Sequence, residues 1–425
     1  MDDIFQFSEK INTLSEKALE KAKGQFENIE RIAEYNQQKV LSAFINHRVS
    51  EAHLGTSTGY GYGDVGRDTL DRIVADIFNT EDAVIRTSLV SGTHTLCVVL
   101  FGILRPGDTL LCVSGTPYDT LHSTIGINEQ KTKGTGTLRD FGVNYREIAL
   151  REDESFDIEE IKKQAADESV RMVYIQRSRG YDTRHSLSVD EIKEVCDAVH
   201  QVSENAIVFV DNCYGEFVDT KEPTDVGADL TAGSLIKNMG GGVALCGGYI
   251  AGRHDLVEKC TYRMTTPGLG REVGASLNQN RNLYMGLFHA PHVVGEALKT
   301  AVFASALFDE MGFDASPKFN EKRNDIVQLI MLKNPENLCA FCRGIQKGSP
   351  VDSFVTPEPW DMPGYDSKVI MAAGTFTGGS SIELSADAPL REPFAVWMQG
   401  GLNIASGKTA VKFAAEEVEN ELKKS

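Results

Sequence analysis

Between residues 83 and 252 the chain alternates short apolar runs with longer amphipathic stretches. Stretches such as 157–168 and 188–202 place apolar residues at helical spacing, and the apolar runs between them have the length of strands. Strands that alternate with helices are typical of a mainly parallel sheet covered by helices on both faces. The runs that we expect to be strands are 83–90, 109–113, 143–150, 171–176, 206–211 and 243–252.

The two ends of the chain follow other patterns. Residues 1–45 have helical periodicity and many charges, and a Gly/Tyr-rich stretch, 53–70, comes after them. A helical region at about 283–312 precedes a mixed C-terminal part, where we expect strands at 340–345, 368–376 and 380–385 and a closing helix at 404–424. The sequence thus predicts an N-terminal helical arm and interface segment (1–65), a large α/β domain (66–312) and a small C-terminal α+β domain (313–425).

The charge balance argues against two classes of partner. With 61 acidic and 43 basic side chains the chain has a formal net charge of -18, and such a surface repels nucleic-acid phosphates and anionic lipid. No apolar run approaches the roughly 20 residues of a membrane span. The first residues lack the pattern of a signal peptide, so we expect a cytoplasmic protein that binds neither nucleic acid nor membrane.

The cysteines are expected to be buried free thiols. Six of the eight lie singly along the chain. Cys339 and Cys342 form a C-x-x-C pair, but no second pair of ligands lies at a suitable spacing for zinc. We therefore predict no metal site.

Asp211 is the first residue with a chemical interpretation. It closes the apolar run AIVFVD, and ligands in open α/β sheets bind outside the carboxyl ends of the strands. A carboxylate at that position can face a ligand. Taken alone, Asp211 is better explained as a helix cap or a turn residue.

Lys237 is the second, in the segment TAGSLIKNMGGG. Ser234 lies three residues before it and three glycines, 240–242, follow closely. Glycines let the backbone pass close to a ligand, and burial favours the neutral amine that a Schiff-base lysine needs. A surface lysine beside a mobile glycine loop is the alternative that this segment alone leaves open.

The third is the turn Ser91-Gly92-Thr93, which follows a predicted strand and opens an apolar helix. Free amides and hydroxyls at the positive end of a helix dipole suit a phosphate, although an ordinary helix cap looks the same. The order of the three features removes much of this ambiguity. Pyridoxal 5′-phosphate (PLP) requires a phosphate site, a carboxylate for its pyridine nitrogen and a lysine for its aldehyde. The sequence therefore predicts a PLP site.

At this point the chain resembles a known family, the fold-type-I PLP-dependent enzymes of cysteine and methionine metabolism. More narrowly, it is similar to the methionine γ-lyase-like aluminium-resistance proteins. The resemblance runs from about Tyr60 to the C-terminal helix. It is carried by GYGYGDVGRDTLDRI, LVSGTHTL, VFVDNCYGEF, GSLIKNMGGGVALCGGYIAG and GSSIELSADAPLREPFAVWMQGGL.

The resemblance implies a mostly parallel, seven-stranded sheet flanked by helices, with a small C-terminal α+β domain. It also implies a homodimer or homotetramer whose active sites lie at the subunit interface. Lys237 would form the Schiff base and then move the Cα proton, and Asp211 would pair with the pyridine nitrogen. Tyr118 would stack on the cofactor ring as a catalytic residue.

Further residues follow from the same resemblance. The phosphate would be bound by Ser91, Gly92, Thr93 and Ser234, and by Tyr62 of a neighbouring subunit, with Tyr60 or Arg67 as further candidates. Arg391 would bind the substrate carboxylate as a bidentate partner. Each has a plain structural alternative: Tyr118 as a turn aromatic, Arg391 in a surface ion pair, and Arg67 as support for the helix after it.

The chain departs from the family pattern at three places. No asparagine follows 171–176 to bond the cofactor O3′, and Arg177, Arg179 or Tyr181 is left as its replacement. Ile236 precedes the lysine, which removes one hydroxyl from the phosphate site. His94 stands where a small residue is common, and it either contacts the ligand or packs in the first helical turn.

The function that the resemblance implies is a carbon–sulfur lyase acting on a sulfur amino acid, either as a cystathionine β-lyase or as a methionine γ-lyase. Two alternatives stay open from the sequence. One is another PLP reaction, by an aminotransferase, an aldolase or a cysteine desulfurase. The other is a PLP-binding regulatory protein without turnover.

Overall fold

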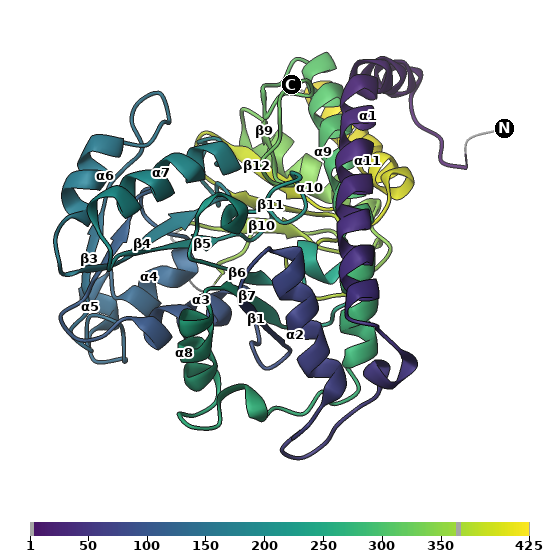
Figure 1. The fold of residues 1–425 in the computed structure, drawn as a ribbon. Coiled ribbons are helices and arrows are strands. Elements are labelled where there is room, and N and C mark those ends of the chain that lie inside the picture. Colours follow the sequence, from purple (N-terminus) through teal and green to yellow (C-terminus); the bar gives the residue numbers. More distant parts are fainter. Residues whose placement is uncertain (1–3, 363–366, 425) are drawn as a thin grey trace. The chain divides into compact units, whose positions relative to one another are not determined.

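The computed structural model describes residues 4–362 and 367–424, and the chain divides into two compact units (Figure 1). Tyr35–Ala290 form the larger unit, and Met1–Glu34 with Pro291–Ser425 form the other. The long helices α1 (Glu9–Asn46) and α9 (Asn280–Glu310) each supply residues to both units, and Pro291 lies inside α9. For this reason the limits of the units differ from the expected domain limits at residues 65 and 312.

The larger unit contains the predicted mostly parallel sheet of seven strands, in the order β1-β7-β6-β5-β4-β2-β3. β7 runs antiparallel to both of its neighbours, β1 and β6. The strands are β1 (Asp82–Arg86), β2 (Thr109–Cys112), β3 (Asn144–Glu147), β4 (Val170–Gln176), β5 (Ile207–Asp211), β6 (Leu230–Ser234) and β7 (Gly248–Gly252). Each of the six expected runs overlaps one of these strands, and β1 and β4 each begin one residue before the expected run.

The sequence analysis missed β6 because its residues, LTAGS, do not form an apolar run. The strand is nevertheless fully buried. A side chain at Gly233 has no room, since a Cβ there would lie 2.4 Å from Glu216 Oε1. Tight packing in three dimensions therefore replaces hydrophobic patterning as the reason for this strand.

Alternate residues of the strands enter two cores on opposite faces of the sheet, as the pleat requires. Met172 and Tyr174 pack with α3 (Gly92–Ile103) and α8 (His254–Met264), whereas Val173 and Ile175 pack with α6 (Ile158–Ala165) and α7 (Val189–Val202). The remaining helical elements of this unit are α2 (Val65–Ile77), α4 (Asp119–Ile125), α5 (Glu129–Thr132), and the 3-10 turns η1 (Glu51–Leu54), η2 (Pro223–Val226), η3 (Asn238–Gly240) and η4 (Gly270–Glu272). The expected cover of helices on both faces is confirmed.

The other unit has an antiparallel sheet in the order β10-β11-β12-β9-β8. Its elements are β8 (Ala315–Ser316), β9 (Gln328–Met331), α10 (Pro335–Lys347), β10 (Val369–Ala372), β11 (Ser385–Pro389), β12 (Ala395–Gln399) and α11 (Ile404–Leu422). The expected closing helix and the strand within 368–376 are confirmed. None of the helices in the described ranges combines the length and apolar character that crossing a bilayer requires.

Two strand predictions in this unit were wrong. Residues 340–345 belong to α10, because the Asn334 side chain caps the helix and Pro335 occupies its first turn, where a missing N–H costs nothing. Residues 380–385 mostly precede β11, which begins only at Ser385. Cys339 and Cys342 therefore lie about one turn apart on a helix, both as free thiols.

Candidate active site

Three neighbouring strands of the larger unit end at one edge of the sheet with polar side chains. Gln176 ends β4, Asp211 ends β5 and Ser234 ends β6, and the register pairs Gln176 directly with Asp211. All three residues are buried. This is the edge at which open α/β sheets bind ligands, so the sequence expectation for Asp211 and Ser234 has the required geometry.

Asp211 is 6% exposed, and burial raises the pKa of its carboxyl group. The Cys213 N–H donates to Oδ1 at 3.1 Å and the Tyr174 hydroxyl to Oδ2 at 3.3 Å, and both bonds oppose that rise. The charge of Lys237 opposes it more weakly. A cation placed beside this carboxylate would keep it ionised.

The turn at residues 91–93 lies against the end of β6. A Cβ on Gly92 would be 3.2 Å from Ser234 Cβ and 3.6 Å from Cys213 Sγ, so only glycine lets the start of α3 approach so closely. The Ser91 hydroxyl accepts the His94 N–H at 3.1 Å. The amides of Gly92 and Thr93 stand at the first positions of α3, where a helix offers no acceptor of its own. They are available to an anion.

His94 itself closes the same turn. Its Nδ1 lies 3.2 Å from the Val90 nitrogen, whose N–H donates to it. Thr93 Oγ1 lies 2.8 Å from Thr120 Oγ1, which ties the start of α3 to α4. The structure therefore favours the packing interpretation of His94.

Lys237 follows β6 and is half-buried. Its Nζ donates a hydrogen bond to Tyr214 Oη at 2.8 Å and lies 4.4 Å from the centre of the Tyr214 ring. The glycines after it are required by packing, since a Cβ on Gly240 would lie 1.7 Å from the Leu235 carbonyl oxygen. The alternative of a solvated lysine beside a mobile loop does not describe this segment.

Tyr214 is a site residue that the sequence analysis did not single out. It lies three residues after Asp211, in the left-handed region at φ 71°, which a bulky side chain rarely adopts. A tyrosine after a strand is too common to be a signal by itself. Its contact with Lys237 depends on how two loops pack, which the sequence does not display.

Tyr118 is held at the end of β4. Its N–H donates to Gln176 Oε1 at 2.6 Å, and its ring centre lies 5.9 Å from that of Tyr181. Gly180, at φ 60°, passes so close that a Cβ there would be 3.2 Å from Tyr118 Cδ2. Tyr118 is thus more than a turn aromatic, because three residues of the segment 176–181 contact it.

Buried ionic groups support the loop that follows Asp211. Arg177 Nη1 donates to Asn212 Oδ1 at 2.7 Å and to the Gly215 carbonyl at 2.9 Å. Arg177 therefore supports this loop, which gives it a structural role among the three candidates for the missing asparagine.

Burial raises the pKa of Glu216 to about 8, with the neighbouring Glu222 carboxylate acting in the same direction. Glu216 accepts a hydrogen bond from the Tyr249 hydroxyl at 2.9 Å.

The Gly/Tyr-rich segment carries two exposed tyrosines and one buried arginine. Tyr60 and Tyr62 are 73% and 61% exposed, with ring centres 5.6 Å apart. Arg67 is buried, and its Nη1 donates to the carbonyls of Gly61 and Gly274 at 2.9 Å each. Arg67 therefore supports the loops at Gly61 and Gly274, whereas its structural alternative named the helix after it.

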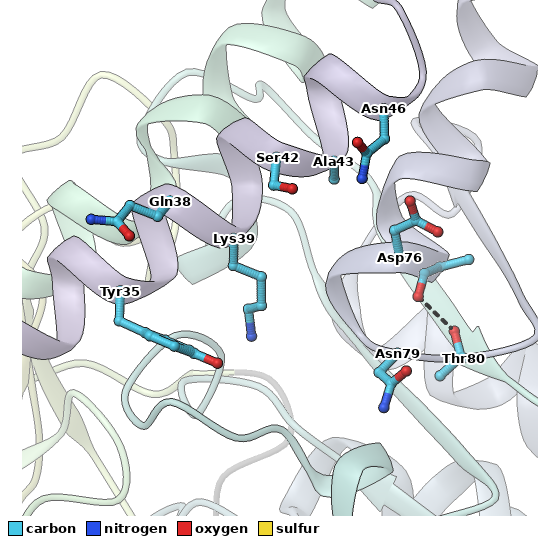
Figure 2. A pocket seen from close by; sticks show the side chains of 10 residues that line it. Tyr35, Gln38, Lys39, Ser42, Ala43, Asn46, Asp76, Asn79 and Thr80 are labelled. Atoms are coloured by element: carbon cyan, nitrogen blue, oxygen red, sulfur yellow. Dashed lines mark hydrogen bonds between the residues drawn. The ribbon is translucent and has the colours of Figure 1, made fainter.

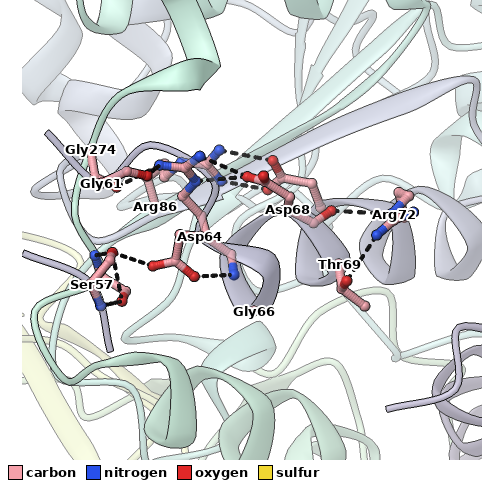
Figure 3. Close-up of polar contacts among 12 residues, drawn as sticks. Ser57, Gly61, Asp64, Gly66, Asp68, Thr69, Arg72, Arg86 and Gly274 are labelled. Atoms are coloured by element: carbon pink, nitrogen blue, oxygen red, sulfur yellow. Dashed lines mark hydrogen bonds and ion pairs between the residues drawn. The ribbon is translucent and has the colours of Figure 1, made fainter. Parts of the chain in front are cut away.

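Asp64 anchors the same segment, lying between Ser57 and the first turn of α2 in Figure 3. Burial alone would raise the pKa of Asp64. Hydrogen bonds from the Arg67 N–H and from Ser276, Ser57 and Asn280 instead lower it to about 2.

Arg391 belongs to the other compact unit. It lies exposed in the turn between β11 and β12, where its N–H donates to the Pro389 carbonyl at 2.8 Å. The group of residues that converge in the larger unit does not include it.

A pocket of about 490 Å³ lies between α1 and α2, away from these residues (Figure 2). Lys39 extends from α1 between Tyr35 and Asn79 in this view. Its buried ammonium has no hydrogen-bond partner among the described residues. Burial raises the pKa of Glu222, and the charge of Lys39 opposes that rise, so Lys39 acts as a counter-charge for Glu222. None of the converging residues lines this pocket.

Known proteins resemble this chain over nearly its whole length. The family model described as methionine gamma-lyase matches residues 11–419. YnbB of Bacillus subtilis, an uncharacterized protein, is 47% identical over 395 residues, which are 93% of each chain. A structure named as a carbon–sulfur lyase involved in aluminum resistance, from Clostridium novyi NT, is 51% identical with a TM-score of 0.93 and 96% of each chain covered. A structure from Clostridium acetobutylicum, named as a candidate cystathionine beta-lyase involved in aluminum resistance, has the same values.

Proposed function

The chain belongs to the methionine gamma-lyase family, and we propose that it is a PLP-dependent carbon–sulfur lyase that eliminates a thiol from a sulfur amino acid. The observation that carries the proposal is the placement of Lys237. Its half-buried amine is held by Tyr214, in a loop that leads directly from Asp211. The lysine, the carboxylate and the proposed anion site come from three segments of the chain, 234–237, 211–214 and 91–93.

The side chains present fit this cofactor. The amides of Gly92 and Thr93 and the Ser234 hydroxyl would hold the phosphate, Asp211 the pyridine nitrogen, and Lys237 the aldehyde. Asp211 provides the structural test of the fit. Its carboxyl is buried at the end of a strand and burial raises its pKa, so a protonated ring nitrogen beside it would favour the charged form.

When bound, the cofactor stabilises negative charge at the Cα of an amino acid. Lys237 would take the Cα proton, because its amine is the base that the surrounding loops hold in place. Asp211 would maintain the positive charge on the ring nitrogen, and Tyr118 would keep its ring against the cofactor. A β-elimination and a γ-elimination both begin at Cα, so Lys237 would serve cystathionine and methionine alike.

Two further roles complete the proposal. Arg391 would bind the substrate carboxylate, since a guanidinium pairs with a carboxylate through two hydrogen bonds. Tyr62 would reach the phosphate in a neighbouring copy, which makes a homodimer the smallest active form and a homotetramer the other expected form. The exposure of Tyr62 supports this role. The desulfurase alternative loses support at Cys213, because burial raises the pKa of its thiol and keeps it protonated.

The test is an absorbance spectrum with PLP, followed by assays of ammonia and 2-oxo acid released from cystathionine, methionine and cysteine. We expect a visible band that borohydride abolishes, and we expect it to be absent in Lys237→Ala. Lys163→Ala, which removes an exposed lysine of the same unit, is the matched control. A native protein that stays colourless with PLP, or that never releases a 2-oxo acid, contradicts the proposal.

A further inference from the structure

The amine of Lys237 and the phenol of Tyr214 form a direct pair. Nζ donates to Oη at 2.8 Å and lies 4.4 Å from the ring centre, so the ammonium contacts both the phenolic oxygen and the π face. A hydrogen bond from a charged group and a cation–π contact both restrain a lysine side chain, which otherwise samples many rotamers. Tyr214 therefore selects one position for the amine.

The backbone that presents Tyr214 is strained. Tyr214 has φ 71° and Phe217 has φ 62°, although neither is glycine. Non-glycine residues keep such a conformation only where surrounding contacts impose it, and they gather at functional sites. Gly215 follows Tyr214 directly, yet the positive φ falls on the tyrosine. The loop conformation therefore fixes the position of the aromatic ring and does not relieve the strain.

Three buried contacts impose the conformation. Arg177 Nη1 binds the Gly215 carbonyl at 2.9 Å, and the Glu222 carboxylate accepts the Phe217 N–H at 2.8 Å. Asn238, the residue after Lys237, donates from Nδ2 to the Glu216 carbonyl at 2.9 Å. This last bond joins the lysine segment to the tyrosine loop a second time, so the two loops cannot separate without breaking buried hydrogen bonds.

We propose that Tyr214 is the positioning residue for the Lys237 amine. Its oxygen accepts a hydrogen bond whenever the lysine is free and charged, while the proton stays on nitrogen. In a lyase cycle, which is the proposed function on which this consequence rests, Lys237 becomes an ammonium on taking the Cα proton. Tyr214 then holds that ammonium until the same proton passes to the leaving sulfur.

The first test needs no cofactor. Cofactor-free protein is treated with limiting acetic anhydride at pH 8, and acetylation of the Lys237 peptide is measured by mass spectrometry against that of Lys163. In Tyr214→Phe we expect Lys237 to react about tenfold faster, because the bond that stabilises its ammonium is lost. Tyr284→Phe is the control, since it removes another buried hydroxyl, which donates to the Gly66 carbonyl at 2.7 Å. It should leave the Lys237 rate unchanged.

Equal Lys237 rates in native protein and Tyr214→Phe, with the fold intact by circular dichroism, overturn the inference. Should Tyr214→Phe fail to fold, Tyr214→Asn replaces it, because asparagine tolerates positive φ and removes the phenol. In the loaded enzyme, Tyr214→Phe should lower kcat by about tenfold with KM little changed. If the native protein stays colourless with PLP, the proposed function is contradicted, but the labelling result still tests the role of Tyr214. If the native protein is coloured and active, and Tyr214→Phe has the same Lys237 acetylation rate and kcat, only the inference about Tyr214 is contradicted.

Discussion

Tyr174 and Asp211 lie on adjacent strands, and the tyrosine hydroxyl donates to the carboxylate Oδ2 at 3.3 Å. Both residues are buried, Tyr174 in the core under the sheet and Asp211 at its edge. Burial raises the pKa of the Asp211 carboxyl, and this hydrogen bond lowers it. A core residue thus helps to keep the proposed cofactor carboxylate ionised.

Tyr174→Phe should therefore have a larger effect on the site than on the fold. Loss of one buried hydrogen bond costs about 1–2 kcal/mol, to be measured by urea unfolding. In PLP titrations Tyr174→Phe should bind PLP more weakly than wild type, and the midpoint of its titration should shift as pH falls. If Tyr174→Phe binds PLP with the affinity of wild type across pH 6–8, the role given to this hydrogen bond is contradicted.

Asp211→Asn should lower kcat by at least about a hundredfold while the fold is retained, because a neutral amide does not hold a proton on the ring nitrogen. The measurement is 2-oxo acid release by protein saturated with PLP. Glu168→Gln, which neutralises an exposed carboxylate of the same unit, is the control and should leave kcat unchanged. Full activity in Asp211→Asn would remove this residue from the mechanism.

Glu216→Gln should change how stability depends on pH. Burial raises the pKa of Glu216 from 4.5 to about 8, so the folded protein binds a proton that the unfolded chain releases above pH 4.5. Stability contributed by this proton is complete below pH 4.5 and declines as pH rises towards 8. The neutral glutamine should thus stabilise the protein relative to wild type by up to roughly 5 kcal/mol at pH 8, and by little at pH 4.5.

Thermal unfolding of both proteins at pH 5, 7 and 9 checks this. The difference in Tm should grow from pH 5 to pH 8 and then level off. Glu168→Gln, an exposed carboxylate of the same unit, is the control. A constant difference at all three pH values contradicts the raised pKa of Glu216.

Gly233→Ala should destabilise the protein by about 2 kcal/mol, because overpacking forces neighbouring groups apart. The new Cβ would lie 2.4 Å from Glu216 Oε1 and 2.7 Å from the Tyr249 ring. Gly24→Ala on α1 has nothing within 4 Å and should instead stabilise by about 0.5–1 kcal/mol, because alanine favours a helix. Chemical denaturation of both variants measures the contrast, and equal effects refute it.

Tyr62 and Lys237 should complement each other between subunits. Tyr62→Ala and Lys237→Ala are each expected to be inactive, since each damages every site of a homo-oligomer. Refolding an equal mixture should restore about a quarter of the activity, because half the dimers would be mixed and each would hold one intact site. A mixture as inactive as its components would place Tyr62 in the site of its own chain or outside the site.

Much of the fold was predictable because it follows local rules. The alternation of apolar runs with amphipathic stretches predicted six strands of the larger sheet and the helices on both faces. The rule failed at β6, whose burial depends on close backbone packing, and at 340–345, where the Asn334 cap and Pro335 direct a helix. Hydrophobic run length does not distinguish those cases.

The residue types of the site were also visible in the sequence: a strand-end carboxylate, a lysine before a glycine run and a helix start suited to phosphate. Chemistry of that kind resides in single side chains and short motifs. What only the tertiary structure decided is how these groups meet. In the folded chain Gly92 lies against Ser234, and the Tyr118 N–H donates to Gln176. Arg67 and Arg177 bind the carbonyls of nearby loops, and Tyr214 accepts a hydrogen bond from the Lys237 amine. Those contacts join residues distant in sequence, and they arise from the packing of the sheet edge and its loops, which no local pattern encodes.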